Sequence, residues 1–194
     1  MRKLLLILIL TFSFQSWTKA DDISDFQIEG MSIGDSALDF FSKSEILEGR
    51  VNYYKSKKYT PVELTPSFLK TYSDFSFSYK TNDKKYIIER MSGIIDYRNK
   101  DIKNCLKQVD EVANEISEVF EGAATKSDKY EKIFWGVDKT GKSKYTLINF
   151  TFGSGDNVVV ACYDFSEEST YSDNLNVEAK TGTFENFLNN EAYK

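Results

Sequence analysis

The stretch 99-NKDIKNCLKQVDEVANEISEVFEG-122 decides the fold class. Its apolar residues recur at steps of three and four, which is the spacing of one helix face. That face contains Ile102, Cys105, Val109, Val112, Ile116 and Val119. The opposite face carries Lys, Asp and Glu, as expected of a solvent-exposed side. Asn99 can cap the start and Gly122 can end the helix, so the pattern predicts an amphipathic helix over 99–122 that packs on another layer.

Segments typical of β-strands lie on both sides of this helix. They are Val51–Tyr54, Phe75–Tyr79 and Tyr86–Tyr97 before it, and Ile133–Val137, Lys144–Phe152, Asn157–Phe165 and Asn174–Lys180 after it. These segments are rich in β-branched and aromatic residues, and polar turns separate them. Gly93 within the third segment indicates a bulge.

Two further segments are expected to be helical. Ile28–Gly49 has capping-box spacing at Ser32 and Asp35, and its apolar residues share one face. Thr183–Asn189 is expected to form a short terminal helix. The order predicts an α+β fold: an antiparallel sheet of about seven strands with the two main helices on one face. It resembles two tandem α-β-β-β units in one domain, residues 21–194, whose other sheet face is wet or a binding surface.

Residues 1–20 are expected to be a signal peptide and not part of the fold. Arg2 and Lys3 precede an apolar run over Leu4–Leu10, and Thr18-Lys19-Ala20 offers a cleavage site. The run is too short to span a bilayer, and no second run reaches that length. The mature chain is therefore expected to be periplasmic or secreted, with no transmembrane span. The alternative is a retained N-terminal anchor helix.

The composition excludes several classes of activity. The 194 residues contain no His, which removes Ser-His-Asp and Cys-His catalysis and His-ligated zinc or haem. The net charge is −5, and it becomes −8 without residues 1–20. A protein of that sign is a poor general binder of nucleic acid, so we expect no nucleic-acid partner. We expect no cofactor and no metal site.

The two cysteines of an exported chain most simply form one disulfide. Cys105 lies on the predicted helix and Cys162 in a predicted strand, 57 positions apart. Closing that loop contributes about 4 kcal/mol in the chain-entropy model. Two buried free thiols are the alternative.

One segment is both basic and aromatic, and it is the only candidate binding site that the sequence offers. Residues 50–59, here called the basic segment, include Arg50, Tyr53, Tyr54, Lys55, Lys57 and Lys58. These side chains are suited to an anionic partner, because the charges attract it and tyrosines give rigid contact area. The alternative is an edge strand whose lysines prevent aggregation.

Two motifs resemble catalytic or phosphate-binding sequences. Gly136-x-x-x-x-Gly141-Lys142-Ser143 matches the phosphate-loop pattern, but the residues that follow predict a strand and not the required helix. A β-hairpin with Gly141 at positive φ is the expected structure. Gly34-Asp35-Ser36 is similar to the nucleophile block of the GDSL esterases, but Ser36 lacks a histidine base.

Two polar features remain open. The acidic loop over residues 164–174 contains Asp164, Glu167, Glu168 and Asp173, and oxygen ligands of this kind suit calcium. Its spacing does not match an EF-hand, and a solvated loop is the expected structure. Asn149-Phe-Thr151 fits a glycosylation acceptor but lies in the middle of a predicted strand.

The segments 26-FQIEGMSIGDSALDFF-41, 105-CLKQVDE-111 and 160-VACYD-164 resemble a family of small secreted proteins of SAR11-type marine alphaproteobacteria. The resemblance implies an envelope location and the pairing of the two cysteines, and it carries no functional residue. Gly30-Met31-Ser32 at a helix start is similar to the small outer-membrane assembly lipoproteins and to the β-lactamase-inhibitor-like fold. This chain lacks the lipid-bearing cysteine, so the second likeness concerns the fold alone.

These observations favour a non-enzymatic binding or protein-interaction module that presents its sheet face or its basic segment. Its partner would be an envelope protein, or an anionic glycan or lipid surface. The alternative is a carboxylate-dependent hydrolase that acts on envelope polysaccharide. Two acids facing each other in a deep cleft would favour that alternative, whereas a sheet face without such a cleft favours binding.

Overall fold

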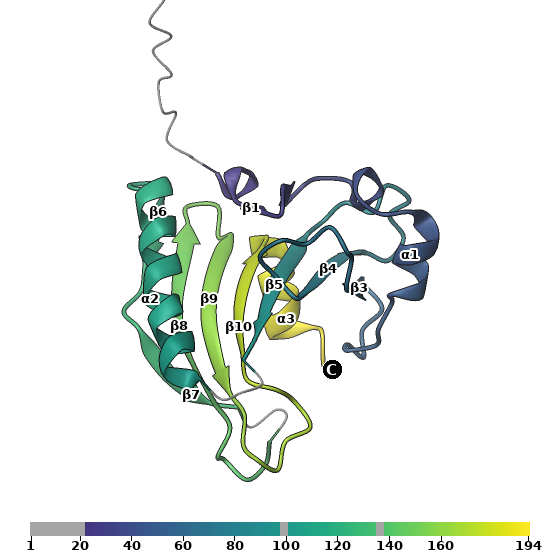
Figure 1. The fold of residues 1–194 in the computed structure, drawn as a ribbon. Helices are drawn as coiled ribbons and strands as arrows, with labels where there is room; N and C mark the ends of the chain where they lie inside the picture. Colours follow the sequence, from purple (N-terminus) through teal and green to yellow (C-terminus); the bar gives the residue numbers. More distant parts are fainter. Residues whose placement is uncertain (1–21, 98–100, 135–137) are drawn as a thin grey trace, which may run out of the picture.

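An eight-stranded antiparallel sheet forms the centre of the computed structural model, which describes residues 22–97, 101–134 and 138–194 (Figure 1). Across the sheet the strands are β3 (Tyr59–Leu64), β4 (Asp74–Lys80), β5 (Arg90–Asp96), β10 (Asn174–Lys180), β9 (Asn157–Asp164), β8 (Lys144–Phe152) and β6 (Ala124–Lys126), and β7 (Tyr130–Ile133) also pairs with β8. The helices are α1 (Lys43–Glu48), α2 (Ile102–Val119) and α3 (Gly182–Asn190). The predicted α+β class with one large antiparallel sheet is confirmed.

The order of the strands shows how the two halves of the chain meet. The first half runs α1, β3, β4, β5, and the second runs α2, β6, β7, β8, β9, β10, α3. The last long strand of each half lies at the centre, where β5 and β10 pair antiparallel over seven residue pairs. The tandem order expected from the sequence is therefore present, and one continuous sheet joins the halves.

One face of the sheet, here called the inner face, packs against α2 and the N-terminal residues. Alternate residues of the strands point to this face, because side chains alternate along a strand. In β9 and β10 they include Val160, Leu175 and Val177, all at most 1% exposed. Cys105 of α2 forms a disulfide with Cys162 of β9, with Cα atoms 5.8 Å apart, so sulfur joins the helix covalently to the sheet.

The segment Ile28–Gly49 is not one helix, which corrects the expectation. It contains β1 (Gln27–Ile28) and β2 (Met31–Ser32), a 3-10 turn over Ala37–Asp39, and the short α1. Gly34 has φ of +94° and interrupts any helix at this point. The apolar residues expected on one helix face are nevertheless buried, because Ile33, Ala37 and Phe41 enter the same core from turns.

Two finer predictions for the first half of the sheet also need correction. Val51–Tyr54 is irregular, and the edge strand is Tyr59–Leu64 instead. Gly93 forms no bulge, because it pairs in regular register with Phe75 and Val177. A β-carbon at Gly93 would lie 2.5 Å from the Tyr72 ring, so close packing and not strand geometry requires glycine there. In the second half, β7 covers Tyr130–Ile133, and residues 135–137 of the expected strand lie outside the described residues.

The opposite face of the sheet, here called the outer face, is covered by α3 on one side. Phe184 and Phe187 of α3 are fully buried against Tyr59 and Tyr54, and Figure 1 shows α3 behind β5 and β10. Asp156 accepts a hydrogen bond of 2.6 Å from the backbone of Gly182, which ties the start of α3 to the β8–β9 turn. The helix α3 does not cover the outer faces of β7, β8 and β9.

The expected signal peptide at residues 1–20 and the expected cap Asn99 lie outside the described residues. Within the ranges that the structure describes, none of the helices is long and apolar enough to cross a membrane.

Candidate functional site

A groove of about 310 Å³ lies on the outer face, over β7, β8, β9 and β10 and against the edge of α3. We call it the outer groove. Its lining has aromatic, amide, charged and aliphatic side chains: Tyr130, Phe134, Tyr145 and Tyr163; Asn149 and Asn157; Lys132, Glu178, Lys180 and Glu185; and Leu147, Val159 and Ala161. A groove with aromatic walls and a few convergent polar groups is the usual form of a small-ligand site.

The aromatic part is a packed row of rings along the uncovered strands. Tyr145 of β8 and Tyr163 of β9 are register partners, and their rings stack with centroids 5.4 Å apart. Phe134 contacts both, at 5.5 and 5.7 Å. The row continues through Phe165 to Tyr171, which is 58% exposed. These rings support one another, so they present a rigid apolar surface at low entropy cost.

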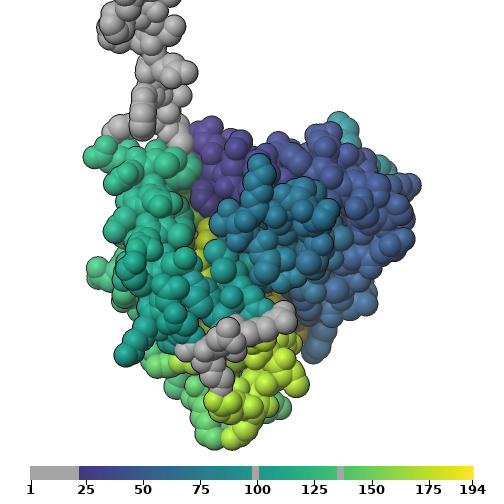
Figure 2. Space-filling model, viewed as in Figure 1, coloured from purple at the N-terminus to yellow at the C-terminus, as the bar shows by residue number. Residues whose placement is uncertain are grey.

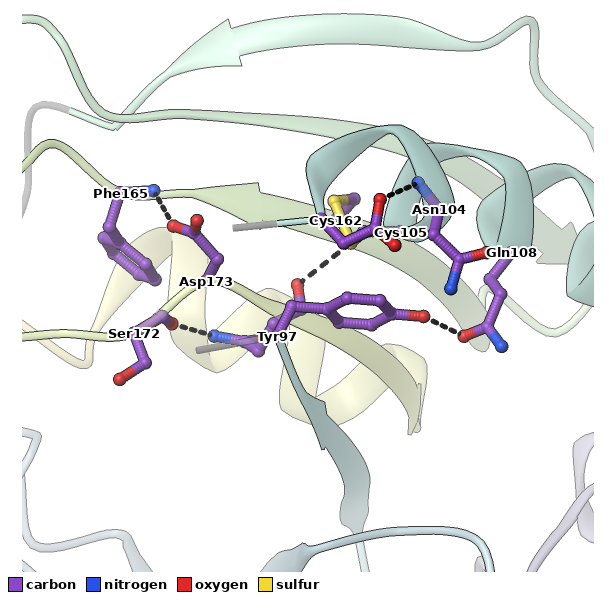
Figure 3. The surroundings of a disulfide bond; sticks show 10 residues. Tyr97, Asn104, Cys105, Gln108, Cys162, Phe165, Ser172 and Asp173 are labelled. Atoms are coloured by element: carbon purple, nitrogen blue, oxygen red, sulfur yellow. Dashed lines mark hydrogen bonds between the residues drawn. A yellow bond between two sulfur atoms is a disulfide. The ribbon is translucent and has the colours of Figure 1, made fainter. Parts of the chain in front are cut away.

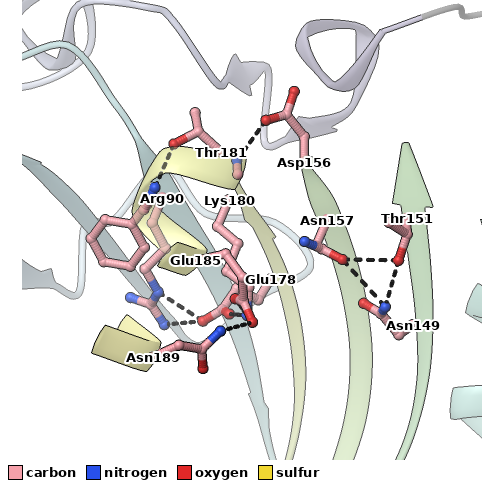
Figure 4. A network of polar contacts seen from close by, with 12 residues as sticks. Arg90, Asn149, Thr151, Asp156, Asn157, Glu178, Lys180, Thr181, Glu185 and Asn189 are labelled. Carbon is pink, nitrogen blue, oxygen red and sulfur yellow. Dashed lines mark hydrogen bonds and ion pairs between the residues drawn. The ribbon is translucent and has the colours of Figure 1, made fainter. Parts of the chain in front are cut away.

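Two amide side chains lie farther along the same face of β8 and β9, beyond the Leu147–Ala161 pair. Figure 4 shows them. Asn149 donates to the hydroxyl of Thr151 at 2.9 Å and to the Asn157 side chain at 3.3 Å. Thr151 also donates to Asn157, at 3.1 Å. These bonds hold the amides in place with donors and acceptors side by side. Asn149, which fits a glycosylation motif, lies within β8 as the sequence predicts and takes part in this network.

The charged part is an ion-pair network across the central strands (Figure 4). Glu178 accepts from Arg90 Nε at 2.7 Å and pairs with Lys180 at 2.9 Å. Lys180 also pairs with Glu185 of α3 at 2.8 Å. Burial alone would raise the pKa of Glu178, but the charges of Arg90 and Lys180 outweigh it and hold the pKa at about 2. Glu178 and Glu185 likewise raise the pKa of Lys180 above its usual value, against the effect of burial.

The carboxylates of the outer groove are not arranged for glycoside hydrolysis. A general acid in such an enzyme needs a raised pKa, whereas the pKa of Glu178 is lowered. Lys180 lies between Glu178 and Glu185 and pairs with both. The arrangement therefore supports binding and orientation of a ligand better than proton transfer to it.

The basic segment borders a different part of the outer face, next to α3. Its two ends serve internal contacts: Arg50 Nε donates to the Tyr79 hydroxyl at 2.9 Å, and Lys58 pairs with Glu191 at 2.9 Å. Tyr54 packs edge-on against Phe187 at 5.2 Å. The segment thus holds α3 and the C-terminus in place.

The remaining residues of the basic segment are more exposed. Tyr53 donates a hydrogen bond to Glu63, and burial together with that carboxylate raises its pKa. Lys57 donates to Asn52 at 3.4 Å, and Lys55 is exposed. Four of the six candidate residues, Arg50, Tyr53, Tyr54 and Lys57, line one hollow, and binding of an anionic partner there stays a prediction.

The residues around the disulfide hold α2 against the sheet (Figure 3). Cys105 and Cys162 are buried under α2, and the Cys105 sulfur lies 3.6 Å from the carbonyl oxygen of Asn174. The Tyr97 hydroxyl donates to Gln108 of α2 nearby. The disulfide predicted from the sequence is present, and the alternative of two free thiols is not.

The two motifs with catalytic resemblance have structural roles. The strand β8 begins at Lys144, directly after Ser143, so no helix follows the phosphate-loop pattern. Gly141 has φ of +74°, as expected for the hairpin, and Gly136 lies outside the described residues. Asp138 accepts bonds from the side chains of Thr140 and Ser143, both at 2.6 Å, and these bonds hold its pKa well below the usual range. Ser36 donates to the Lys85 carbonyl at 2.7 Å and caps the 3-10 turn.

The acidic loop over 164–174 is tied to its surroundings. Asp173 is 5% exposed and accepts a 2.7 Å bond from the backbone of Phe165, and Glu168 pairs with Lys142 at 2.6 Å. Across residues 22–97, 101–134 and 138–194, no three His, Cys, Asp or Glu side chains gather in a way that could hold a metal ion.

The residues of the outer groove were not singled out from the sequence. Alternation within Lys144–Phe152 and Asn157–Asp164 assigns Tyr145, Asn149 and Tyr163 to one face, which is a signal that could have found them. No local sequence pattern predicts where α3 docks, although its position decides which half of that face is open. Comparison of the chain with protein families, curated proteins and solved structures returned no match.

Proposed function

We propose that the protein is a non-enzymatic binding module that acts outside the cytoplasm and holds a glycan in its outer groove. The observation that supports this most strongly is that the aromatic row and the amide pair line one groove. Tyr145 and Tyr163 supply flat apolar rings, and Asn149 and Asn157 supply donors and acceptors within the same groove.

A glycan fits this combination because a sugar ring has one apolar face of C–H groups and an edge of hydroxyls. The apolar face packs on an aromatic ring, and amide side chains can donate to and accept from the hydroxyls. The groove lining carries two basic side chains, Lys132 and Lys180, and two acidic ones, Glu178 and Glu185, so it has no strong charge of one sign. A protein partner would be favoured by a flatter and more apolar patch than this groove of about 310 Å³.

The location outside the cytoplasm is supported by the disulfide. A buried Cys105–Cys162 bond is compatible with an oxidising compartment, where such bonds form and persist. The apolar run over Leu4–Leu10 follows two basic residues, as in a signal peptide, and this also supports export.

Electrophoresis through gels that contain soluble polysaccharides tests the proposal. Neutral and acidic polysaccharides are compared, and binding slows migration of the protein. We expect at least one polysaccharide to retard the wild type, and Tyr145→Ala to weaken that retardation by about tenfold, since a lost ring contact costs about 1.4 kcal/mol.

The matched control is Tyr193→Ala, because Tyr193 is 61% exposed and lies outside the outer groove. It should leave retardation unchanged. Thermal unfolding of each variant shows whether the fold is kept. Equal retardation of both variants, or no retardation by any polysaccharide, would contradict a glycan site in the outer groove.

A further inference from the structure

A second hollow lies on the inner face, where α2 leaves a gap beside the first half of the chain. Figure 2 shows it as a depression with the strand β10 at its bottom. Its volume is about 440 Å³, within the range of small-molecule sites. We call it the inner cleft. It is separate from the outer groove, because the sheet lies between them.

The walls of the inner cleft are mostly apolar and come from five separate segments, of which β10 contributes Leu175 and Val177. The helix α2 contributes Val112 and Val119, and the N-terminal segment contributes Phe26. Ile95 of β5 lies at the floor, and Tyr72 comes from the loop before β4. An apolar surface open to water at the junction of the two halves is a common place for a ligand.

The Tyr72 ring is fixed in position by the strand beneath it. It lies over Gly93, where even a β-carbon would come within 2.5 Å of the ring. This contact places the ring against the backbone of β5 without any intervening side chain. The cleft wall at Tyr72 is therefore preformed, and a ligand need not displace it.

Charge decides which kind of ligand the inner cleft suits. Its described lining includes the carboxylates Asp25, Glu111 and Glu115 and no Lys or Arg. Glu111 pairs with Lys107, but both are more than half exposed, so water screens that pair. Burial, together with the negative charges of Glu29 and Glu115, raises the pKa of Tyr72 to about 12, so its phenol stays neutral.

We propose that the inner cleft binds a small organic cation, an amine or ammonium group attached to an apolar body. The apolar body would contact Val112, Ile95 and the Tyr72 ring, and the cationic group would face Glu115 and Asp25 at the rim. An aromatic ring beside the cation adds a favourable cation–π contact. An anion of the same shape would meet like charges at the rim and would be excluded.

Three small probes of similar shape test this site: phenethylamine, the neutral 2-phenylethanol and the anionic 3-phenylpropionate. Calorimetric titration of the full chain should show saturable one-to-one binding of phenethylamine, weaker binding of the alcohol and none of the anion. Glu115→Gln should weaken phenethylamine by about fivefold and leave the alcohol unchanged, because only the charged contact is lost.

The matched control is Glu118→Gln, since Glu118 is an exposed residue of α2 that does not line the cleft. It should change the affinity by less than about twofold. Val112→Asn, which adds a polar group without a charge, should weaken both phenethylamine and the alcohol, and amide chemical shifts confirm that each variant is folded. Binding of the anion as tight as that of the amine, no saturable binding of the amine, or an equal loss in Glu118→Gln would overturn the proposal.

Discussion

Arg90 in β5 and Glu178 in β10 form an ion pair across the two central strands, with Arg90 Nη2 2.6 Å from Glu178 Oε2. The two side chains are 15% and 18% exposed, and they join the two halves of the chain on the outer face. Lys180 extends the pair to Glu185 of α3. The network therefore links the sheet to the helix that borders the outer groove.

Removal of the Glu178 charge should destabilise the fold. Glu178→Gln leaves Arg90 and Lys180 close together with no full negative charge between them, and breaking such a pair costs about 3 kcal/mol. Urea unfolding at pH 7 measures the free energy of unfolding. Glu118→Gln on the exposed side of α2 is the control and should cost less than about 0.5 kcal/mol. Equal stability of Glu178→Gln and the wild type would show that the network contributes nothing.

The same carboxylate predicts how stability depends on pH. The pKa of Glu178 falls from an ordinary value of 4.5 to about 2 in the folded state. Its contribution is therefore complete above pH 4.5 and is lost as the pH falls from 4.5 towards 2. Between pH 4.5 and pH 2 the free energy of unfolding should fall further for the wild type than for Glu178→Gln. The difference between the two decreases should be about 3 kcal/mol. Parallel profiles for the two proteins would contradict the pKa assignment.

The disulfide should stabilise the fold mainly by restricting the conformations of the unfolded chain. The double variant Cys105→Ala, Cys162→Ala should unfold with about 4 kcal/mol less free energy, since the bond closes a loop of 57 positions. Urea unfolding with and without dithiothreitol checks this value. The reductant should lower the stability of the wild type and leave the double variant unchanged. Equal free energies of unfolding for the oxidised and the fully reduced wild type would contradict this contribution.

Gly93 should be intolerant of any side chain. Gly93→Ala brings a β-carbon within 2.5 Å of the Tyr72 ring, so the ring or the strand must move, at a cost of about 2 kcal/mol. In the background of Tyr72→Ala that cost should disappear, which a double-mutant cycle measures by urea unfolding. The same cost in both backgrounds would mean that another neighbour, and not Tyr72, requires glycine.

Local patterns in the sequence were enough to predict much of the fold. The period of Ile102–Val119 predicted α2, and the β-branched and aromatic residues of Lys144–Phe152 and Asn157–Phe165 predicted β8 and β9. Such patterns report burial of one side of a regular element, which is why they worked there. In Ile28–Gly49 similar spacing was misleading, since apolar residues on turns reach the same core as those on a helix.

The candidate site depended on tertiary structure that no local pattern contains. Alternation places Tyr145 and Tyr163 on one face, but the docking of α3 decides which part of that face stays open. Arg90, Glu178 and Lys180 look like ordinary surface charges in the sequence. Arg90 pairs with Glu178 only because β5 and β10, 84 positions apart at Ser92 and Asn176, become neighbours in the sheet.

Amide chemical-shift mapping by NMR tests the central claim most directly. A polysaccharide fragment that retards the protein is titrated into the labelled chain, and the perturbed amides are placed on the structure. We predict perturbations at the outer faces of β8 and β9, around Tyr145, Asn149 and Tyr163, with little change at the basic segment. Perturbations confined to Arg50–Lys58, or spread without any focus on β8 and β9, would contradict binding in the outer groove.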